Sequence, residues 1–336
     1  MKTEAMHYET KEDNSIICQL CAHHCTIAPG DFGLCGLRQN QEGRLYTYVY
    51  GEPIAAHLDP IEKKPLYHFL PGTLSYSIAT IGCNFKCRFC QNWQISQISY
   101  KESRPNDIPR ILPEEIVEQA LHYNARSISY TYTEPTIFFE YAYEIAKLAK
   151  EKGLYNIFVT NGYMTPQALE KIRPYLDACN VDLKSFQDDF YRKNCQARLQ
   201  PVLDNIRLIK TMGIWMEVTT LIIPNENDSS KELNQMAAFI AQVDPDIPWH
   251  LSRFHPDYKF MDHGATDIKT LHEAQKIAHK HNLKYVYLGN VPESADTYCP
   301  NCNQVLIKRS YFNTSKINIR NGQCPHCQMP IPGLWI

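Results

Sequence analysis

The sequence has no uninterrupted apolar run of about eighteen residues, the length that a membrane-spanning helix requires. The polar stretch 1–15 also lacks the apolar segment of a secretory signal peptide. A large charge imbalance is absent too, since the formal net charge is -2 over 336 residues. This argues against a whole-molecule electrostatic grip on nucleic acid or on an anionic membrane. We therefore expect a cytoplasmic globular protein without a membrane partner.

Cysteine, by contrast, is abundant, with 13 residues. Thiols stay reduced in the cytoplasm, so these cysteines are expected to bind metal rather than to form disulfides. All except Cys179 and Cys195 fall into three groups: one near the beginning of the chain, one central and one near its end. Each group is a candidate metal site.

The central group lies in the loop 81–93, where Cys83, Cys87 and Cys90 have C-x3-C-x2-C spacing. A [4Fe-4S] cluster needs one ligand for each iron, so three thiolates leave one iron free to bind a non-protein ligand. Two alternatives remain open at this point. One is a zinc site completed by His68 or another side chain, and the other is a chance run of cysteines.

The first group has C-x2-C-x3-C-x9-C spacing and consists of Cys18, Cys21, Cys25 and Cys35. Four thiolates complete a tetrahedral site, for which structural zinc is the simplest occupant. A second iron-sulfur cluster that relays electrons to the first is the competing interpretation. His23 and His24 could substitute as ligands, although adjacent histidines in a polar loop are more often solvated.

The last group consists of two C-P-x-C knuckles separated by twenty-one residues: Cys299, Cys302, Cys324 and Cys327. This spacing is typical of a zinc ribbon. Residues 299–336 contain no acid but include four cations, Lys308, Arg309, Lys316 and Arg320, and the aromatic pair Tyr311 and Phe312. They could bind nucleic acid, but the cations more simply offset the negative charge of four thiolates on Zn²⁺.

Between these groups, short segments typical of strands alternate with amphipathic stretches typical of helices. The predicted strands are 74–81, 127–132, 156–160, 178–183, 214–223, 250–254 and 284–288. Six or seven such units favour an α/β fold, a partial (β/α)6-type barrel with a parallel sheet and outer helices. We expect three regions: an N-terminal four-cysteine metal-binding region with a connecting segment (1–72), the barrel (73–294) and a ribbon-like domain (295–336).

In such barrels the chemistry lies at the carboxyl ends of the strands. The central cysteine loop follows the first predicted strand and therefore falls on that face. Thr131 and Thr133 point to one side of the second strand, which indicates a lumen that holds a polar ligand. Asp182 and Lys184 share a face at the end of the fourth strand, where a charged pair is costly unless it binds something or is paired internally.

The central cysteine spacing, with Phe89 between Cys87 and Cys90, resembles the cluster loop of radical S-adenosylmethionine (SAM) enzymes. The resemblance implies that the free iron binds the amino and carboxylate groups of SAM. Reductive cleavage of SAM would then give a 5′-deoxyadenosyl radical that removes hydrogen from a substrate. It also implies an electron donor such as flavodoxin or ferredoxin.

Several strand ends extend this resemblance. Residues 132–135 look like the family's Gly-Gly-Glu-Pro segment, which hydrogen-bonds the SAM amino group, with Glu134 retained and both glycines absent. Asp182 and Lys184 resemble cofactor contacts of glycyl-radical activases, Asn161 lies in a similar Thr-Asn-Gly turn, and His255 matches a cofactor-proximal histidine. Glu217 stands where an activase arginine is expected, which puts an activase substrate in doubt.

The first cysteine group, the segment 59–72, residues 91–93 and the ribbon resemble the radical SAM enzymes of AmmeMemoRadiSam systems. That group is similar to pyruvate formate-lyase activating enzymes. The implied function is a radical SAM oxidoreductase acting on an unidentified substrate such as a protein. A small metabolite or a nucleic acid as the substrate, or a non-catalytic metal-binding interaction protein, are the alternatives.

Overall fold

The computed structural model describes residues 2–102 and 108–335, and its centre is an eight-stranded sheet. The strands follow one another in sequence order, and neighbours from β8 to β14 are parallel. They are β8 (Leu74–Ala79), β9 (Ser127–Tyr130), β10 (Tyr155–Thr160), β11 (Ala178–Asp182), β12 (Trp215–Ile222), β13 (Trp249–Arg253) and β14 (Val286–Gly289). Each corresponds to a strand predicted from the sequence, so the parallel architecture is confirmed.

One strand of this sheet was not predicted. The strand β7 (Ala55–Pro60) pairs antiparallel with β8 and forms the edge of the sheet. It includes His57 and Asp59 and ends in a proline, so it lacks the apolar character of the parallel strands. Such polarity and a terminal proline are tolerated at an edge, where one row of backbone groups is unpaired. The main sheet thus begins inside the region 1–72.

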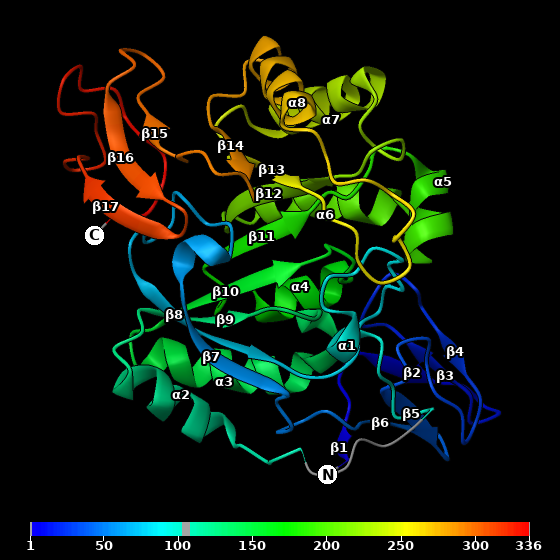
Figure 1. Cartoon of the computed structure of the whole chain (residues 1–336). Helices are drawn as coiled ribbons and strands as arrows, with labels where there is room; N and C mark the ends of the chain where they lie inside the picture. The colour runs from blue at the N-terminus through cyan, green and yellow to red at the C-terminus, as the bar shows by residue number, and fades with distance from the viewer. Residues whose placement is uncertain (1, 103–107, 336) are drawn as a thin grey trace.

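Helices cover the outer face of the sheet, and each connects one parallel strand to the next (Figure 1). They are α2 (Pro113–His122), α3 (Phe139–Glu151), α4 (Pro166–Ile172), α6 (Gln200–Thr211), α7 (Ser230–Val243) and α8 (Ile268–Lys280). Side chains cap three of these helices, because Thr165, Ser229 and Asp267 accept backbone hydrogen bonds at the starts of α4, α7 and α8. None of the described helices has the length and apolarity needed to cross a bilayer.

Shorter helical turns connect the remaining elements: η1 (Ile61–Lys63), α1 (Trp93–Ser96), η2 (Pro135–Phe138), α5 (Asp188–Phe190) and η3 (Tyr191–Cys195). The core lies between the sheet and the outer helices, where apolar side chains such as Ile128, Phe158 and Ile206 are buried. Strands covered by helices on one side and open to a lumen on the other form the predicted partial barrel.

Two small antiparallel sheets precede the barrel, at the lower right of Figure 1. One contains β1 (Thr3–Glu4), β5 (Arg38–Gln41) and β6 (Arg44–Thr47), and the other contains β2 (Tyr8–Thr10), β3 (Ile16–Cys18) and β4 (Thr26–Ile27). They dock on the turn between β10 and α4. Ala22 N donates to Tyr163 O over 2.9 Å, and Thr165 N donates to Leu20 O over 3.0 Å.

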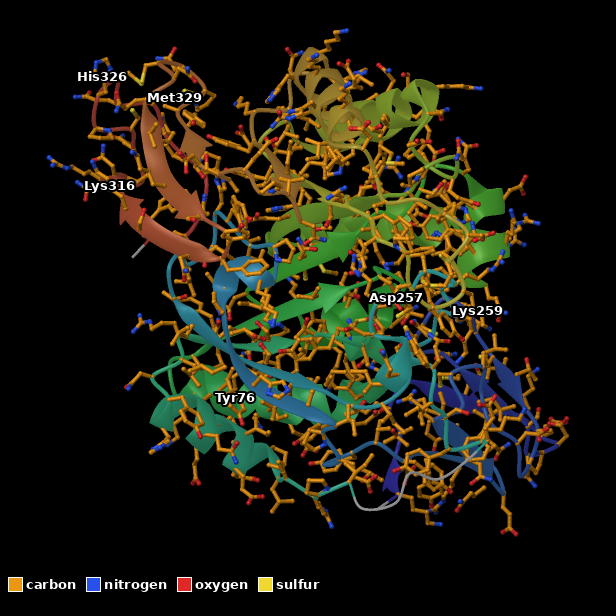
Figure 2. The ribbon with its side chains drawn as sticks, in the orientation of Figure 1. Tyr76, Asp257, Lys259, Lys316, His326 and Met329 are labelled. Carbon is orange, nitrogen blue, oxygen red and sulfur yellow. The ribbon has the colours of Figure 1, made fainter. Side chains whose placement is uncertain are left out.

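The C-terminal sheet contains β15 (Thr297–Tyr298), β16 (Val305–Ser310) and β17 (Asn313–Ile317) and lies on the opposite side of the barrel from the N-terminal sheets (Figure 1). Arg309 fixes it to the barrel, since its buried guanidinium donates to Tyr67 O over 2.7 Å. The tail adds a second attachment, because Leu334 N donates to His68 O over 2.8 Å. Figure 2 shows Lys316 and His326 on the side of this sheet away from the barrel.

Candidate functional site

One cavity of about 860 Å³ lies at the carboxyl ends of the parallel strands. The strand register brings its polar groups together. For example, Thr160 lies beside Val181, so that Asn161 and Asp182 emerge at the same edge. Most of the site residues predicted from the sequence line this cavity: Cys83, Cys87, Cys90, Glu134, Asn161, Asp182 and Lys184.

The three central cysteines are held in the loop between β8 and α1. Phe85 N donates to Cys83 Sγ over 3.3 Å, and Ser96 Oγ lies 3.1 Å from Cys90 Sγ. Burial raises the pKa of both thiols, so bare thiolates are disfavoured here and metal would have to stabilise them. The three sulfurs do not all lie within 4.8 Å of one another, as ligands of one ion would. A cluster in which each thiolate binds a different iron does not require the sulfurs to lie so close together.

Cys195, which stands apart in the sequence, lies against this loop. It ends the π-helical turn η3, which docks through Lys86 N donating to Cys195 O and Arg88 N donating to Asn194 O, both over 2.9 Å. A hydrogen bond with the Cys195 thiol raises the pKa of Cys87. The π turn, which is rare and often marks functional sites, has no sequence signature that would have revealed this contact.

Glu134 is buried at the cavity wall and joins two strand ends. Its carboxylate accepts hydrogen bonds from Thr160 Oγ1 and Asn161 N, each over 2.8 Å, and from the backbone and hydroxyl of Thr136. Burial raises its pKa, and these donors offset part of that effect. The Glu134 carboxylate is thus already hydrogen-bonded within the protein. The segment 132–135 would therefore contact a ligand through its backbone groups.

The segment 132–135 contains no glycine, yet one of its residues adopts a backbone conformation that favours glycine. Tyr132 has a φ of 61°, a left-handed conformation that glycine adopts freely and tyrosine rarely adopts. Two contacts hold it there: Asn92 Nδ2 donates to Tyr132 O over 2.8 Å, and the Tyr132 hydroxyl donates to Asp59. Tyr132 is therefore held in a conformation that a glycine at this position would adopt without strain.

Lys64 is a cavity residue that the sequence analysis missed. Its ammonium pairs with Asp59 at 2.6 Å and lies 4.5 Å from the centre of the Tyr132 ring. Burial lowers the pKa of Lys64 to about 8. No sequence pattern marks it, because Lys64 follows η1 in a segment without regular periodicity.

Asp182 and Lys184 form an ion pair of 2.7 Å at the end of β11. Burial opposes the charge on Lys184, but the neighbouring Asp182 carboxylate holds the pKa of this lysine well above its ordinary value. Asn161 Nδ2 donates to Asn84 Oδ1 over 2.7 Å and so connects this edge to the central cysteine loop. The cavity thus presents a cation, a carboxylate and an amide beside the three thiols.

His255 is placed differently from the other predicted residues, since it does not line the cavity. Its Nδ1 lies 3.1 Å from Gln91 Nε2, in a loop that covers the central cysteine loop from outside. The same covering loop contains Asp257 and Lys259, which are labelled in Figure 2. Lys259 N donates to Arg88 O over 2.9 Å, and Trp93 Nε1 donates to Asp257 over 3.2 Å.

Glu217, which departs from the activase pattern, lies in the lumen on β12 and is fully buried. Its carboxylate accepts hydrogen bonds from His250 Nε2 over 2.7 Å, from the backbone of Tyr67 and His68, and from Trp215 Nε1. His250 and Tyr67 line the cavity, whereas Glu217 does not. Glu217 therefore supports the cavity floor, a role that the sequence analysis missed.

His68 does not complete a zinc site with the central cysteines. Its Nδ1 lies 2.8 Å from Pro332 O, its Nε2 lies 2.6 Å from the Tyr287 hydroxyl, and its side chain does not line the cavity. The alternative of a three-thiolate zinc site completed by His68 is therefore wrong.

The C-terminal cysteines form a compact group. The sulfurs of Cys299, Cys302, Cys324 and Cys327 all lie within 4.8 Å of one another, with Cys299 and Cys327 3.5 Å apart. Tetrahedral zinc with Zn–S bonds of about 2.3 Å places its thiolates about 3.8 Å apart. The four residues fit a single zinc ion.

We expect Cys324→Ser to remove one equivalent of zinc and to unfold the C-terminal sheet locally. The reason is that the small apolar cluster around Cys299, Leu306 and Ile331 is too small to hold this sheet without metal. Zinc analysis and limited proteolysis would show the change. Cys179→Ala, in the barrel, should keep the zinc, and an unchanged zinc content in Cys324→Ser would contradict the assignment.

Comparison with known proteins identifies the family. The profile of the Radical SAM superfamily matches residues 77–237, which include the central cysteine loop. An uncharacterized protein of Methanocaldococcus jannaschii is 46% identical over 331 residues, or 96% of this chain and 97% of that protein. The chain belongs to the radical SAM superfamily. It is therefore a radical SAM enzyme, and this membership implies a [4Fe-4S] cluster and SAM as cofactors, for which the central cysteines fit the cluster.

More distant similarities agree with the fold. The pyruvate formate-lyase-activating enzyme of Clostridium pasteurianum is 22% identical over 215 residues, covering 58% of this chain and 86% of that enzyme. The crystal structure of a radical SAM methyltransferase from Sphaerobacter thermophilus superposes with a TM-score of 0.50 and 14% identity, covering 66% of this chain and 67% of that one. The second comparison supports the radical SAM fold alone.

Proposed function

We propose that this radical SAM enzyme binds its cluster on Cys83, Cys87 and Cys90 and binds SAM in the adjoining cavity. Together the bound cofactors supply reductive cleavage of SAM to a 5′-deoxyadenosyl radical that removes hydrogen from a substrate. One observation carries the proposal: three thiols and the polar groups of three neighbouring strand ends line a single cavity.

Individual residues then have distinct roles in SAM binding. The Asp182 carboxylate, 35% exposed, is suited to accept hydrogen bonds from ribose hydroxyls. The Lys184 ammonium is suited to pair with the SAM carboxylate. The segment 132–135 offers backbone groups to the amino end, and Asn161 holds the facing loop through Asn84. His255 would act only through Gln91 and the covering loop.

We further propose a protein substrate, as in glycyl-radical activases, and membership of the AmmeMemoRadiSam group. Tyr311 and Phe312, which are 71% and 45% exposed, reach the cavity from the C-terminal sheet and offer apolar contacts to an incoming peptide. The distant similarity to a pyruvate formate-lyase-activating enzyme supports the same substrate class. A low-potential protein such as flavodoxin or ferredoxin would supply the electron.

The test is anaerobic reconstitution followed by measurement of 5′-deoxyadenosine formed from SAM. We expect formation to require dithionite or a reduced protein donor and to increase when a peptide substrate is added. A fully loaded cluster that gives no 5′-deoxyadenosine, either with or without candidate peptides, would argue against the proposed activity.

Lys184→Met is expected to raise the KM for SAM about tenfold to a hundredfold, equivalent to about 1.4–2.8 kcal/mol. The change removes the cation that faces the SAM carboxylate and leaves Asp182 unpaired in the cavity. Titration of SAM in the 5′-deoxyadenosine assay measures it. Lys150→Met is the matched control, because it breaks a lysine–aspartate pair with Asp177 outside the cavity. Equal KM values in both variants would contradict the assignment.

A further inference from the structure

The N-terminal cysteines surround a second, enclosed cavity that is separate from the SAM cavity. Cys18, Cys21, Cys25 and Cys35 all line it, although seventeen positions separate the first from the last in the sequence. The rest of the wall is largely apolar and includes Leu20, Ile27 and Ile137. Four thiols that converge on an apolar cavity point to a buried metal centre.

The spacing of these thiols differs from that of the C-terminal zinc group. No three of the four N-terminal sulfurs lie within 4.8 Å of one another, whereas all four C-terminal sulfurs do. A single tetrahedral ion requires thiolates about 3.8 Å apart. An iron-sulfur cluster distributes its thiolates over several irons and so holds them farther apart. The central cysteines, which fit such a cluster, show the same wider spread.

We propose that Cys18, Cys21, Cys25 and Cys35 bind a second iron-sulfur cluster, which passes electrons toward the central cysteine loop. The binding of this cluster is independent of the proposed SAM cleavage, and only its relay role rests on that function. The chemistry is a one-electron transfer in which a reduced low-potential protein is oxidised and no bond is made or broken.

Hydrogen bonds to two of the sulfurs are consistent with a redox role. Arg38 Nη1 donates to Cys18 Sγ, and Leu34 N donates to Cys25 Sγ, each over 3.5 Å. Donors of this kind, and a buried cation in particular, stabilise the more negative reduced state of a cluster. Arg38 is 2% exposed and is itself paired with Glu140, so its position is well defined.

Asn84 joins this cavity to the central loop. It follows Cys83 directly and lines the N-terminal cavity, and its backbone oxygen lies 2.8 Å from His23 Nε2. Its side chain accepts a hydrogen bond from Asn161, which lines the SAM cavity. At the other end, Leu34 is 64% exposed beside Cys35. The N-terminal site thus lies between the protein surface and the central loop, where an electron relay is needed.

The test removes the central cluster and asks whether iron remains. The full-length Cys83→Ala/Cys87→Ala/Cys90→Ala variant is purified and reconstituted without oxygen, and its iron, sulfide and zinc are measured. We expect two to four irons and an EPR signal after dithionite reduction, with one zinc from the C-terminal group. Adding Cys21→Ser and Cys25→Ser should remove both the iron and the signal while that zinc remains, which controls for folding of the C-terminal sheet.

An iron-free triple variant that contains two zinc ions would overturn the second cluster, whatever the wild type does with SAM. Conversely, a wild type that makes no 5′-deoxyadenosine would leave the iron result unaffected, so the two proposals fail separately. The relay is tested by reduction of the central cluster in Cys21→Ser/Cys25→Ser. Protein-donor reduction should slow at least tenfold while dithionite reduction continues, and an unchanged protein-donor rate would overturn the relay.

Discussion

Cys87→Ala is expected to lose the central cluster and to reduce reductant-dependent 5′-deoxyadenosine formation more than about a hundredfold. Cys87 is one of three thiols on the wall of the 860 Å³ cavity, and the loop supplies no other cysteine. Its loss would leave two ligands for four irons, which is too few to retain the cluster. Iron and sulfide analysis and the 5′-deoxyadenosine assay would measure the two effects.

Cys179→Ala provides the matched control, because Cys179 is also buried but lies on β11 and does not line the cavity. It should keep both iron and activity. The thiol of Cys195 lies against Cys87 and could replace it as a cluster ligand. Such a replacement would hide the effect of Cys87→Ala. If Cys87→Ala keeps its cluster, Cys87→Ala/Cys195→Ala should lose it. A cluster that persists in this double variant would contradict the assignment of Cys87.

Glu217→Ala is expected to lower the free energy of unfolding by about 3–5 kcal/mol, because it leaves buried donors without an acceptor. These donors are His250, Trp215 and the backbone of residues 67 and 68. Glu217→Gln preserves the shape and one of the two acceptor oxygens and should cost about 1–3 kcal/mol. Urea denaturation measures both. Glu273→Ala, at an exposed surface pair, should change stability by less than about 0.5 kcal/mol.

The Glu217 effect should also depend on pH. Burial by itself raises the pKa of this carboxyl, but the hydrogen bond from His250 and the nearby His68 hold it below its ordinary value. The folded state therefore binds this proton less readily than the unfolded state does. The stability difference between wild type and Glu217→Gln should be complete above the unfolded pKa of about 4.3 and shrink as the pH falls through the folded value. A difference that grows toward low pH would contradict this.

The Glu217 contacts change how its departure from the activase pattern is interpreted. The resemblance to activases places Glu217 where an arginine is expected and so suggests an altered substrate site. The carboxylate instead binds the backbone of Tyr67 and His68 and does not itself line the cavity. The presence of glutamate in place of arginine therefore affects how the cavity floor is held together. Its effect on substrate contacts is indirect.

The sequence by itself determined the features that depend on local spacing. Each cysteine group contains cysteines three or four residues apart, which must lie close together, and this spacing is why each group could be recognised as a metal site. The alternation of strand-like segments with amphipathic helices predicted the parallel sheet, and the order of the strands then placed Asp182 and Lys184 at the edge where the cavity lies. These inferences needed no contact between distant segments.

Only the tertiary structure decided which distant residues meet. Cys195 reaches Cys87 through a π turn, Lys64 enters the cavity from an irregular segment, and Glu217 binds the backbone 149 and 150 positions away. Such contacts depend on how strands and loops pack in three dimensions, and no periodicity in the chain encodes them. The same holds for the spread of the cysteine sulfurs: sequence spacing identifies the ligands, whereas the folded backbone sets the distances that distinguish a single ion from a cluster.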